Sequence, residues 1–301
     1  MTIIESLKWA NDKLKTVNID SPMLDAEIIL AHILKVSKPA LFAKFNDKLK
    51  IHEEELFAIS IDKRMQNIPI AYIIGKKNFY NKEFKINKNV LIPRPATETL
   101  IDEALLILQS METNSTLICD IGTGSGIIAV TLSDETKMPV IATDISETAL
   151  IIAKQNAIKH NITDIDFQKG NLIEPVINLF KKLHNTNNPK ISSVYPFKNL
   201  VICANLPYLN QKQMETLLPS VQYEPESALA AGIDGLDLYW KLFKQISINR
   251  TKLPRNIHII IEIDPSQSQG IKTLIQHHFP ASKQKIIKDL EKHNRIVVSK
   301  I

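Results

Sequence analysis

Short apolar runs alternate with amphipathic segments between residues 116 and 264, and this alternation constrains the fold more than any other feature. The apolar runs include "TLICDIG", "VIATDI", "LVICANLPY" and "NIHIIIEID", and the amphipathic segments include "GIIAVTLSD" and "ETALIIAKQNAIKH". Uninterrupted apolar strands are typical of a parallel sheet that helices cover on both faces. We therefore predict an α/β domain with a mostly parallel sheet.

The region before this domain has a helical pattern of apolar residues. Apolar residues recur at helical spacing in "TIIESLKWANDKLK", "SPMLDAEIILAHILKV" and "HEEELFAISIDKRMQN", with Ser21 as the expected N-cap and Pro22 at the first helical position. After Pro69, short alternating segments such as "EFKIN" predict a β-hairpin, and helix returns from Ala96 to Met111. We expect a helical domain over 1–72, a hairpin linker over 73–95 and the α/β domain over 96–301. A polar insert, "KKLHNTNNPKISSVYPFKN" (181–199), is expected to be a surface loop.

Composition narrows the class of protein. A chain of 301 residues with 44% hydrophobic content can bury one large core and a smaller one. No apolar run reaches the ~18 residues that span a bilayer, and the start "MTIIESLKWANDKLK" does not have the pattern of a signal peptide. We expect a cytoplasmic protein without a membrane partner, with Cys119 and Cys203 as reduced core thiols. The eight His show no metal-ligand spacing, so we expect no metal, and a net charge of +5 permits but does not require an RNA or ribosome-associated partner.

A glycine-rich turn follows the first apolar run. In "LICDIGTGSGIIAV", Gly122, Gly124 and Gly126 allow the backbone to approach a ligand closely. Their spacing differs from the dinucleotide fingerprint G-x-G-x-x-G. Asp120, just before the turn, would repel a pyrophosphate but suits a ligand with an ammonium and a sulfonium group. An NAD enzyme is therefore disfavoured.

Two further strand ends carry matching chemistry. Asp144 ends "VIATD", where an acid accepts hydrogen bonds from ribose hydroxyls, and Asn171 in "FQKGNL" places an amide where an adenine edge would lie. Each residue alone is equally well explained as part of a turn or a helix cap. Together, three consecutive strand ends predict a site for an adenosine-bearing cofactor.

The combined pattern Asp-x-Gly-x-Gly-x-Gly, Asp144 and Asn-x-Pro-Tyr resembles class I S-adenosylmethionine-dependent methyltransferases. Within them, nearly the whole chain is similar to the HemK/PrmC family, which methylates the glutamine of the Gly-Gly-Gln motif in class I peptide-chain release factors. "IPRPATE" resembles the linker signature of that family. "YEPESALAAGIDGLDLYWKL" resembles the segment after its Asn-x-Pro-Tyr tetrad, which is Asn205–Tyr208 in this chain. The chain has Leu206 where the family usually has Pro, Asn171 where it has Asp, and Ala96 where it has an acid.

The resemblance implies a Rossmann-like, mostly parallel seven-stranded sheet and S-adenosyl-L-methionine as cofactor. It also implies a protein substrate, the release factor, with a role in translation termination, and a monomeric enzyme without a direct nucleic-acid substrate. The substrate amide and the catalysis are assigned to Asn205, Leu206, Pro207 and Tyr208. Cofactor contacts are assigned to Gly122, Thr123, Gly124, Ser125, Gly126, Asp144, Asn171, Leu172 and Asn205.

Chemistry gives the tetrad a specific task. An amide nitrogen is a poor nucleophile, so two acceptors must hold its NH₂ group and aim its lone pair at the methyl. The side-chain oxygen of Asn205 and the carbonyl of Leu206 are the candidates, because Pro207 restricts the residue before it to extended conformations. Tyr208 would stack on the planar amide. Arg94 and Glu98 are expected to brace the linker or to form a structural ion pair.

Other functions remain as alternatives. Asn-x-Pro-Tyr also occurs in enzymes that methylate exocyclic amines of DNA or RNA bases, which should show a basic stripe with exposed aromatic residues. The charge of the N-terminal region is balanced, as in "HEEELFAIS", and this favours a protein partner. A non-catalytic adenosine-binding module would have no need of the intact tetrad.

Overall fold

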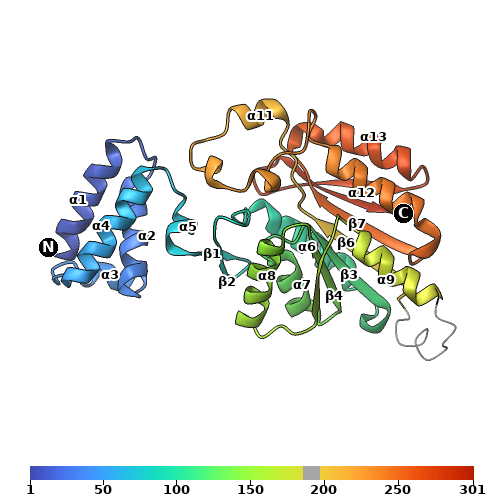
Figure 1. Ribbon diagram of the computed structural model, residues 1–301, viewed down its shortest axis with the longest axis horizontal. Coiled ribbons are helices and arrows are strands. Elements are labelled where there is room, and N and C mark those ends of the chain that lie inside the picture. The colour runs from blue at the N-terminus through green and yellow to red at the C-terminus, as the bar shows by residue number, and fades with distance from the viewer. Residues whose placement is uncertain (186–196) are drawn as a thin grey trace. The chain divides into compact units, whose positions relative to one another are not determined.

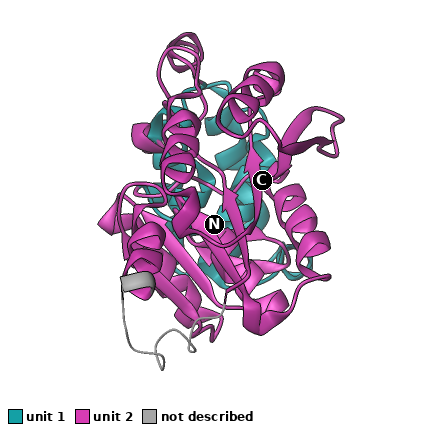
Figure 2. Ribbon diagram, turned by 90° about the vertical axis from the view of Figure 1, so that its right-hand side faces the viewer, with its two compact units in different colours: residues 1–76, 86–88, 218–223 teal, residues 77–85, 89–217, 224–301 magenta. Residues whose placement is uncertain are grey.

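The computed structural model describes residues 1–185 and 197–301, which form two compact units (Figure 2). Unit 1 comprises Met1–Lys76, Ile86–Lys88 and Leu218–Tyr223. Unit 2 comprises Lys77–Lys85, Asn89–Leu217 and Glu224–Ile301. Most of the hairpin residues thus fall in unit 2. No described helix is long and apolar enough to cross a membrane.

Unit 1 is helical, as the apolar spacing predicts. Its helices are α1 (Ile3–Lys15), α2 (Pro22–Leu34), α3 (Lys38–Phe42), α4 (Ile51–Met65) and α5 (Ile70–Ile74) (Figure 1). A capping box of Thr2 and Glu5 starts α1. Helix α2 begins at Pro22 as predicted, although within the described structure the Ser21 side chain makes no cap hydrogen bond. Leu7, Leu30 and other apolar residues of α1, α2 and α4 form the core of the unit.

The predicted hairpin is present, with β1 (Lys76–Phe79) and β2 (Lys82–Lys85). Its two turn residues, Tyr80 and Asn81, have φ of 46° and 58°. A two-residue hairpin turn with both φ values positive matches the right-handed twist of the strands. The backbone N–H of Tyr80 donates to Oε1 of Glu98 at 2.8 Å, which supports this uncommon conformation of a tyrosine.

Unit 2 contains a mostly parallel seven-stranded sheet, which confirms the predicted fold class. The strands lie in the order β5-β4-β3-β6-β7-β9-β8. Strand β9 pairs antiparallel with both β7 and β8, and the pairs from β5 to β7 are parallel. Because β3 pairs with β4 on one side and β6 on the other, the chain reverses direction across the sheet there, where open α/β sheets bind ligands. The strands are β3 (Thr116–Ile121), β4 (Val140–Asp144), β5 (Ile165–Lys169), β6 (Asn199–Ala204), β7 (Asn256–Glu262), β8 (Lys283–Lys288) and β9 (Asn294–Lys300).

Helices cover both faces of this sheet (Figure 1). One face packs against α6 (Ala96–Leu108), α7 (Ile127–Thr136) and α8 (Glu147–Lys159). The other face forms an apolar core with α9 (Glu174–Asn185), α12 (Asp237–Ile248) and α13 (Ser268–His278). Cys119 and Cys203 are buried free thiols, as predicted. The short helices are α11 (Gln211–Glu215), η1 (Thr113–Ser115), η2 (Val221–Tyr223), η3 (Glu226–Ala228), η4 (Arg250–Lys252) and η5 (Pro265–Gln267).

The expected surface loop over 181–199 is wrong at its start. Helix α9 continues to Asn185, because Phe180 and Leu183 extend the apolar stripe that packs on the core. Residues 186–196 of this prediction lie outside the described residues, and Asn199 already begins β6.

Asn156 joins the hairpin to the glycine-rich turn. This fully buried side chain of α8 accepts from the N–H of Lys85 at 2.7 Å and donates to the Lys85 carbonyl at 3.0 Å. It also donates to the carbonyl of Ser125 at 2.8 Å. One amide therefore satisfies three backbone groups, which would otherwise lose their partners.

Replacing Asn156 by Ala should destabilise unit 2 by about 2 to 4 kcal/mol, because these backbone groups lose their hydrogen bonds in a buried place. Urea unfolding of a Trp9→Phe protein, followed by the fluorescence of Trp240, reports on unit 2. The matched control is Gln155→Ala, which changes the exposed neighbour on the same helix. Equal unfolding midpoints for the two variants would contradict the role given to Asn156.

Candidate active site

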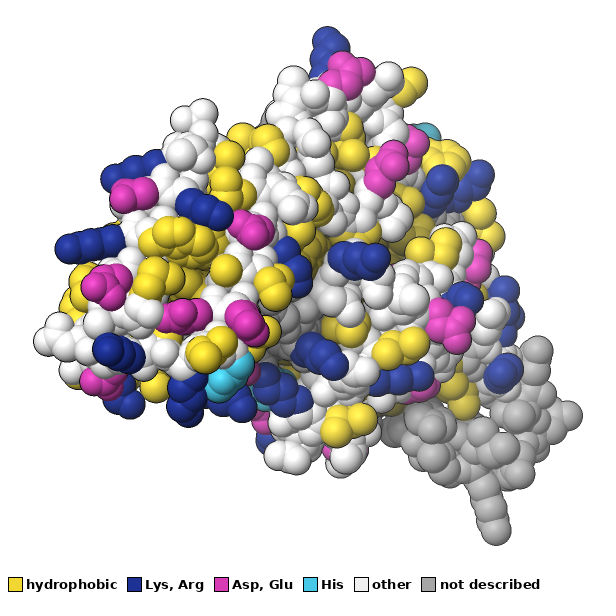
Figure 3. All heavy atoms as spheres, turned by 60° about the vertical axis from the view of Figure 1, so that its left-hand side comes forward, with side chains coloured by type: hydrophobic (Ala, Val, Ile, Leu, Met, Phe, Trp, Pro, Cys, Tyr) yellow, Lys and Arg dark blue, Asp and Glu magenta, His cyan; other side chains and the backbone are white. Residues whose placement is uncertain are grey.

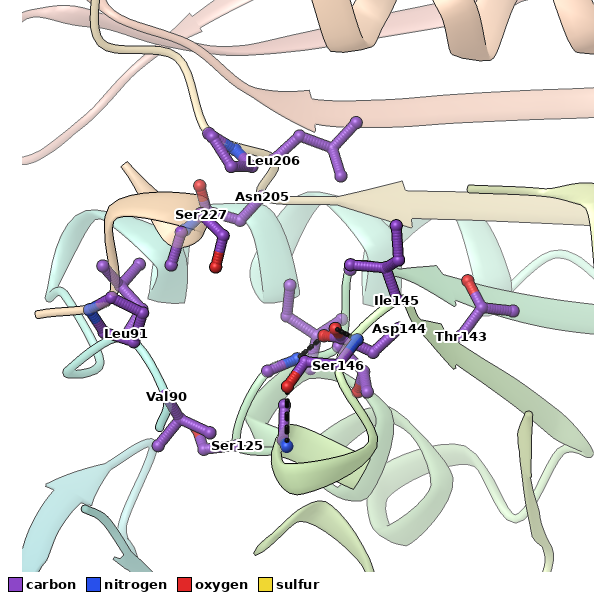
Figure 4. Close-up of a pocket in the computed structure, with 18 of the residues that line it drawn as sticks. Val90, Leu91, Ser125, Thr143, Asp144, Ile145, Ser146, Asn205, Leu206 and Ser227 are labelled. Carbon is purple, nitrogen blue, oxygen red and sulfur yellow. Dashed lines mark hydrogen bonds between the residues drawn. The ribbon is translucent and has the colours of Figure 1, made fainter. Parts of the chain in front are cut away.

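A pocket lies in unit 2 at the carboxyl ends of β3, β4, β5 and β6, where the sequence places its motifs (Figure 4). In Figure 4, Asn205 and Leu206 lie on one side of it, and Asp144 and Ser146 lie on the opposite side. The predicted residues that line it are Gly122, Thr123, Gly124, Ser125, Asp144, Asn171, Leu172, Asn205, Leu206 and Pro207. Two other predicted residues, Gly126 and Tyr208, lie outside this lining. Apolar residues such as Val90, Leu91, Ile145 and Leu238 complete the walls.

The glycine-rich turn is held against the end of β4. The N–H groups of Gly122 and Thr123 both donate to the carbonyl of Thr143 at 2.9 Å. Gly122 has φ of +75°, and a Cβ there would stand 2.8 Å from Cδ2 of Leu206. The glycine is therefore required both by its conformation and by the tetrad packed against it. Gly126 is the N-cap residue of α7.

Asp144 sits where a ribose-binding acid is expected. Its carboxylate accepts from the N–H of Gly124 at 2.9 Å and from the N–H of Ser146 at 2.8 Å (Figure 4). Burial raises the pKa of Asp144, and these backbone hydrogen bonds oppose that shift. Each carboxylate oxygen keeps a further lone pair, so the side chain can accept additional hydrogen bonds from ligand hydroxyls.

The turn after β5 contributes Asn171 and Leu172 to the pocket lining. Asn171 is exposed: its Nδ2 donates to Oε1 of Glu174 at 3.4 Å, and its carbonyl accepts from the N–H of Glu174 at 3.2 Å. Leu172 has φ of +53°, a left-handed conformation that costs a bulky residue about 1 to 2 kcal/mol. Its carbonyl accepts from Oγ1 of Thr143 at 2.9 Å, which holds the strained turn in place.

Asp120 lies buried beside the glycine-rich turn. Its Oδ2 accepts from Oγ1 of Thr123 at 2.6 Å and from the N–H of Ala129 at 3.0 Å. Its Oδ1 is buried without a hydrogen-bond partner among the described residues. Burial, with a smaller contribution from the charge of Asp144, raises the pKa of Asp120 to about 7. An ionised carboxylate here leaves negative charge uncompensated, and a nearby cationic ligand would stabilise that charge.

The raised pKa of Asp120 predicts a pH dependence of stability in the ligand-free protein. The folded pKa of about 7 exceeds the ordinary value of 3.8, so the folded state holds the extra proton between these values. This group favours folding most at low pH, and its contribution is lost as the pH rises toward 7. Asp120→Asn keeps the acceptor but cannot ionise.

The free energy of unfolding of Asp120→Asn, relative to that of wild type, should therefore increase with pH between 3.8 and about 7. The increase should be up to about 1.4 kcal/mol per pH unit. Urea unfolding of both proteins from pH 5 to 8 measures the difference. If the free energies of unfolding of the two proteins change in parallel from pH 5 to 8, Asp120 does not titrate as described.

The tetrad follows β6 and is anchored at several atoms. Asn205 donates through Nδ2 to Oγ1 of Thr97 at 3.1 Å, while its Oδ1 is buried and has no hydrogen-bond partner in the described structure. The N–H of Leu206 donates to the hydroxyl of Tyr239 at 3.3 Å, and this hydroxyl donates to the carbonyl of Glu262. A proline at position 206 has no N–H, so the leucine adds an anchor for the backbone that carries the tetrad.

Tyr208 is oriented by its hydroxyl. This hydroxyl donates to Oε1 of Glu262 at 3.3 Å, and the Tyr208 carbonyl accepts from Nε2 of Gln267 at 2.8 Å. A Cβ at Gly235 would stand 2.2 Å from that carbonyl, so the segment after the tetrad needs its glycine to pack there. Stacking of Tyr208 on a substrate amide stays a prediction.

Glu262 is the site residue that the sequence interpretation missed. It ends β7 beside the tetrad, since Ala204 pairs with Ile261 in the register of β6 and β7. Its side chain is fully buried, and its Oε2 accepts from Oγ1 of Thr97 at 2.7 Å. Burial raises its pKa. The signal was available, because "NIHIIIE" ends in an acid as "TLICD" and "VIATD" do.

The linker signature is bound to the pocket by another glutamate. Nη2 of Arg94 donates to Oε1 of Glu224 at 2.5 Å, and the N–H of Ile92 donates to Oε2 of Glu224 at 3.0 Å. An ion pair of Arg94 with Glu98 is therefore wrong, because Glu98 accepts from the backbone of Tyr80 instead. The buried Glu224 belongs to the segment after the tetrad, so two motifs distant in sequence meet here.

These residues fit a cationic ligand that carries a nucleoside. Asp144 offers acceptors for hydroxyl groups, the glycine-rich turn exposes its backbone to the pocket, and the Oδ1 of Asn205 has no hydrogen-bond partner among the described residues. Apolar walls such as Leu91 and Ile145 suit a base and a methyl group. Within the described part of the chain, no three His, Cys, Asp or Glu side chains are grouped to hold a metal ion.

Comparison with known protein families gives matches to both units. The family model described as the PrmC N-terminal domain matches residues 5–75, and a model described as a methyltransferase domain matches residues 112–186. The release factor glutamine methyltransferase of Bacillus anthracis is 32% identical over 304 residues, which cover 100% of each chain. A bifunctional methyltransferase of Rickettsia typhi is 36% identical over 314 residues, covering 98% of this chain but 57% of the relative.

Among solved structures, the catalytic domain of hMettl16 in complex with MAT2A 3'UTR hairpin 6 is similar with a TM-score of 0.51. It is 15% identical, and the match covers 81% of each chain. At this identity the likeness concerns the fold alone. It agrees with the seven-stranded sheet of unit 2.

Proposed function

The chain belongs to the release factor glutamine methyltransferase family, and from this we propose that it methylates the glutamine of the Gly-Gly-Gln motif in class I peptide-chain release factors. The methyl donor is S-adenosylmethionine, and the acceptor is the side-chain amide nitrogen. As a member of this family the chain is a protein-glutamine N-methyltransferase.

One observation carries the proposal, namely the state of the Asn205 amide. Its NH₂ group is bound to Thr97, while Oδ1 is buried in the pocket lining with no hydrogen-bond partner among the described residues. A buried carbonyl oxygen without a partner costs roughly 1 to 3 kcal/mol, so a ligand N–H that meets it gains most of a hydrogen bond. The substrate NH₂ supplies such a donor.

The second acceptor is the backbone carbonyl of Leu206. Pro207 disfavours helical conformations of the residue before it, and the N–H of Leu206 is bound to Tyr239. The peptide is thus restrained on both sides, and its carbonyl can accept the other proton of the NH₂ group. Two acceptors in one plane orient the nitrogen lone pair out of that plane.

The cofactor is held by residues of three strand ends. Asp144 would accept hydrogen bonds from the ribose hydroxyls, the turn from Gly122 to Gly126 would hold the methionine moiety, and Asn171 and Leu172 would contact the adenine. When bound, S-adenosylmethionine supplies an electrophilic methyl on a sulfonium. The chain itself needs only to align the amide, exclude water with its apolar walls and retain negative charge near the cation.

Unit 1 and the surface support a protein substrate. The family model of the PrmC N-terminal domain covers most of unit 1, which we assign to release-factor recognition. Ile51, Leu56 and Ile59 of α4 are each more than half exposed, at 78%, 51% and 53%, and suit an apolar protein contact. On the face in Figure 3, acidic and hydrophobic side chains lie among the basic ones, and Lys and Arg side chains gather toward its lower edge.

The purified protein should transfer labelled methyl from S-adenosylmethionine to a class I release factor. A Gln→Ala change in the Gly-Gly-Gln loop of the release factor should abolish incorporation, because no NH₂ group remains to be methylated. Mass spectrometry of the loop peptide locates the label. Incorporation into DNA or RNA, with none into the release factor, would overturn the proposal in favour of a nucleobase amine.

Asn205→Ala should lower kcat by about 100-fold or more, since one of the two acceptors that position the amide is removed. The affinity for S-adenosylmethionine, measured by calorimetry, should fall much less than kcat, because the other residues assigned to the cofactor remain. The control is Asn210→Ala, just beyond the tetrad, where the side chain only caps α11. Unchanged turnover in Asn205→Ala would refute the acceptor role.

A further inference from the structure

We propose that Glu262 and Thr97 are positioning residues that fix the amide of Asn205 with its oxygen turned toward the substrate, and thereby select an NH₂ group over a carboxylate. This inference rests on the proposed function and adds the source of its specificity. It concerns two side chains that act through Asn205 and not on the substrate itself.

Three side chains form a directed chain of hydrogen bonds. Oγ1 of Thr97 donates to Oε2 of Glu262 at 2.7 Å, and Nδ2 of Asn205 donates to Oγ1 of Thr97 at 3.1 Å. Thr97 and Glu262 are both fully buried. They come from distant segments, the N-terminus of α6 and the end of β7, and meet beside the residue that follows β6.

The direction of the chain follows from the donors available. A hydroxyl has a single proton, and Thr97 donates it to Oε2 of Glu262. That hydroxyl can then only accept a hydrogen bond from Asn205, so Asn205 must donate through its NH₂ group. A reversed amide would place oxygen against oxygen at Thr97 and would present NH₂ to the substrate. Glu262 therefore sets which end of the Asn205 amide the substrate meets.

Several groups keep Glu262 in place. The hydroxyl of Tyr208 donates to its Oε1, and the hydroxyl of Tyr239 donates to its backbone carbonyl. Arg295 of β9 and Arg94 of the linker contribute positive charge that opposes the effect of burial on its pKa. Arg295 is itself held by Asp289 and by the carbonyl of Ile263.

The consequence is a choice between glutamine and glutamate. With Oδ1 presented, Asn205 accepts from the NH₂ of a glutamine but faces the carboxylate of a glutamate with another oxygen. A site whose polar groups are oriented for one partner rejects the isostere strongly, because its own atoms are left unpaired. If the amide of Asn205 were free to turn, its NH₂ would bind the glutamate oxygen, and this discrimination would weaken.

The test compares Thr97→Val with Thr97→Ser in the full chain. Valine keeps the shape but removes the hydroxyl, so kcat should fall by about 10- to 100-fold while the affinity for S-adenosylmethionine is unchanged. Serine restores the hydroxyl and should recover most of the turnover. Thr131→Val is the matched control, because Thr131 is a buried threonine of α7 whose hydroxyl has no partner among the described residues.

A second measurement distinguishes positioning from simple damage to the fold. Release factors with Gly-Gly-Gln and Gly-Gly-Glu loops are compared as ligands of each variant in the presence of S-adenosylhomocysteine. Wild type should prefer glutamine, and Thr97→Val should reduce that preference by about 10-fold. Glu262→Gln should reduce it too, because an amide at this position can donate as well as accept.

Each outcome decides a separate claim. Methylation by wild type together with unchanged kcat and unchanged preference in both Thr97→Val and Glu262→Gln would overturn the positioning role and leave the proposed function standing. A loss of kcat with the glutamine preference intact would also overturn it, since a structural defect explains that pattern. Absence of methylation by wild type would overturn the proposed function and this inference together.

Discussion

The buried carboxylate of Glu262 determines the polarity of the hydrogen bonds around the tetrad. It accepts from Thr97 and Tyr208 through its side chain and from Tyr239 through its backbone carbonyl. Two of these donors in turn bind Asn205 and Leu206, the residues that are proposed to hold the substrate amide. Burial raises the pKa of Glu262, and these hydrogen bonds and the charges of two arginines oppose that rise. The Oδ1 of Asn205 is thus left without a hydrogen-bond partner among the described residues and can accept from the substrate.

This arrangement explains why motifs far apart in sequence belong together. The linker signature supplies Thr97 to the tetrad and is itself bound by Glu224 from the segment that follows the tetrad. The parallel sheet brings the ends of β3, β4, β6 and β7 to one edge, so the cofactor turn and the tetrad become neighbours. Leu206 packs so near Gly122 that a Cβ there would stand 2.8 Å from its Cδ2.

Local patterns were sufficient to predict α1, α2 and α4 of unit 1, the hairpin and the parallel sheet, but not the short helices α3 and α5, because apolar periodicity is determined by which face is buried. The pocket residues from Gly122 to Asp144 were predictable for the same reason, since they end successive buried strands. Partners of charged groups were not. Arg94 pairs with Glu224 and not with Glu98, and Glu262 was overlooked, because such pairings depend on which segments the fold brings together. The predicted loop over 181–199 also began too early, because α9 continues to Asn185.

The central claim is that the oxygen of Asn205 and the carbonyl of Leu206 receive the two protons of the substrate NH₂ group. A crystal structure with S-adenosylhomocysteine and a release factor tests it most directly. The glutamine nitrogen is expected at about 2.7 to 3.2 Å from both oxygens, with Nδ2 of Asn205 still directed at Thr97. A glutamine nitrogen bound elsewhere, or an Asn205 amide turned with its oxygen toward Thr97, would contradict it.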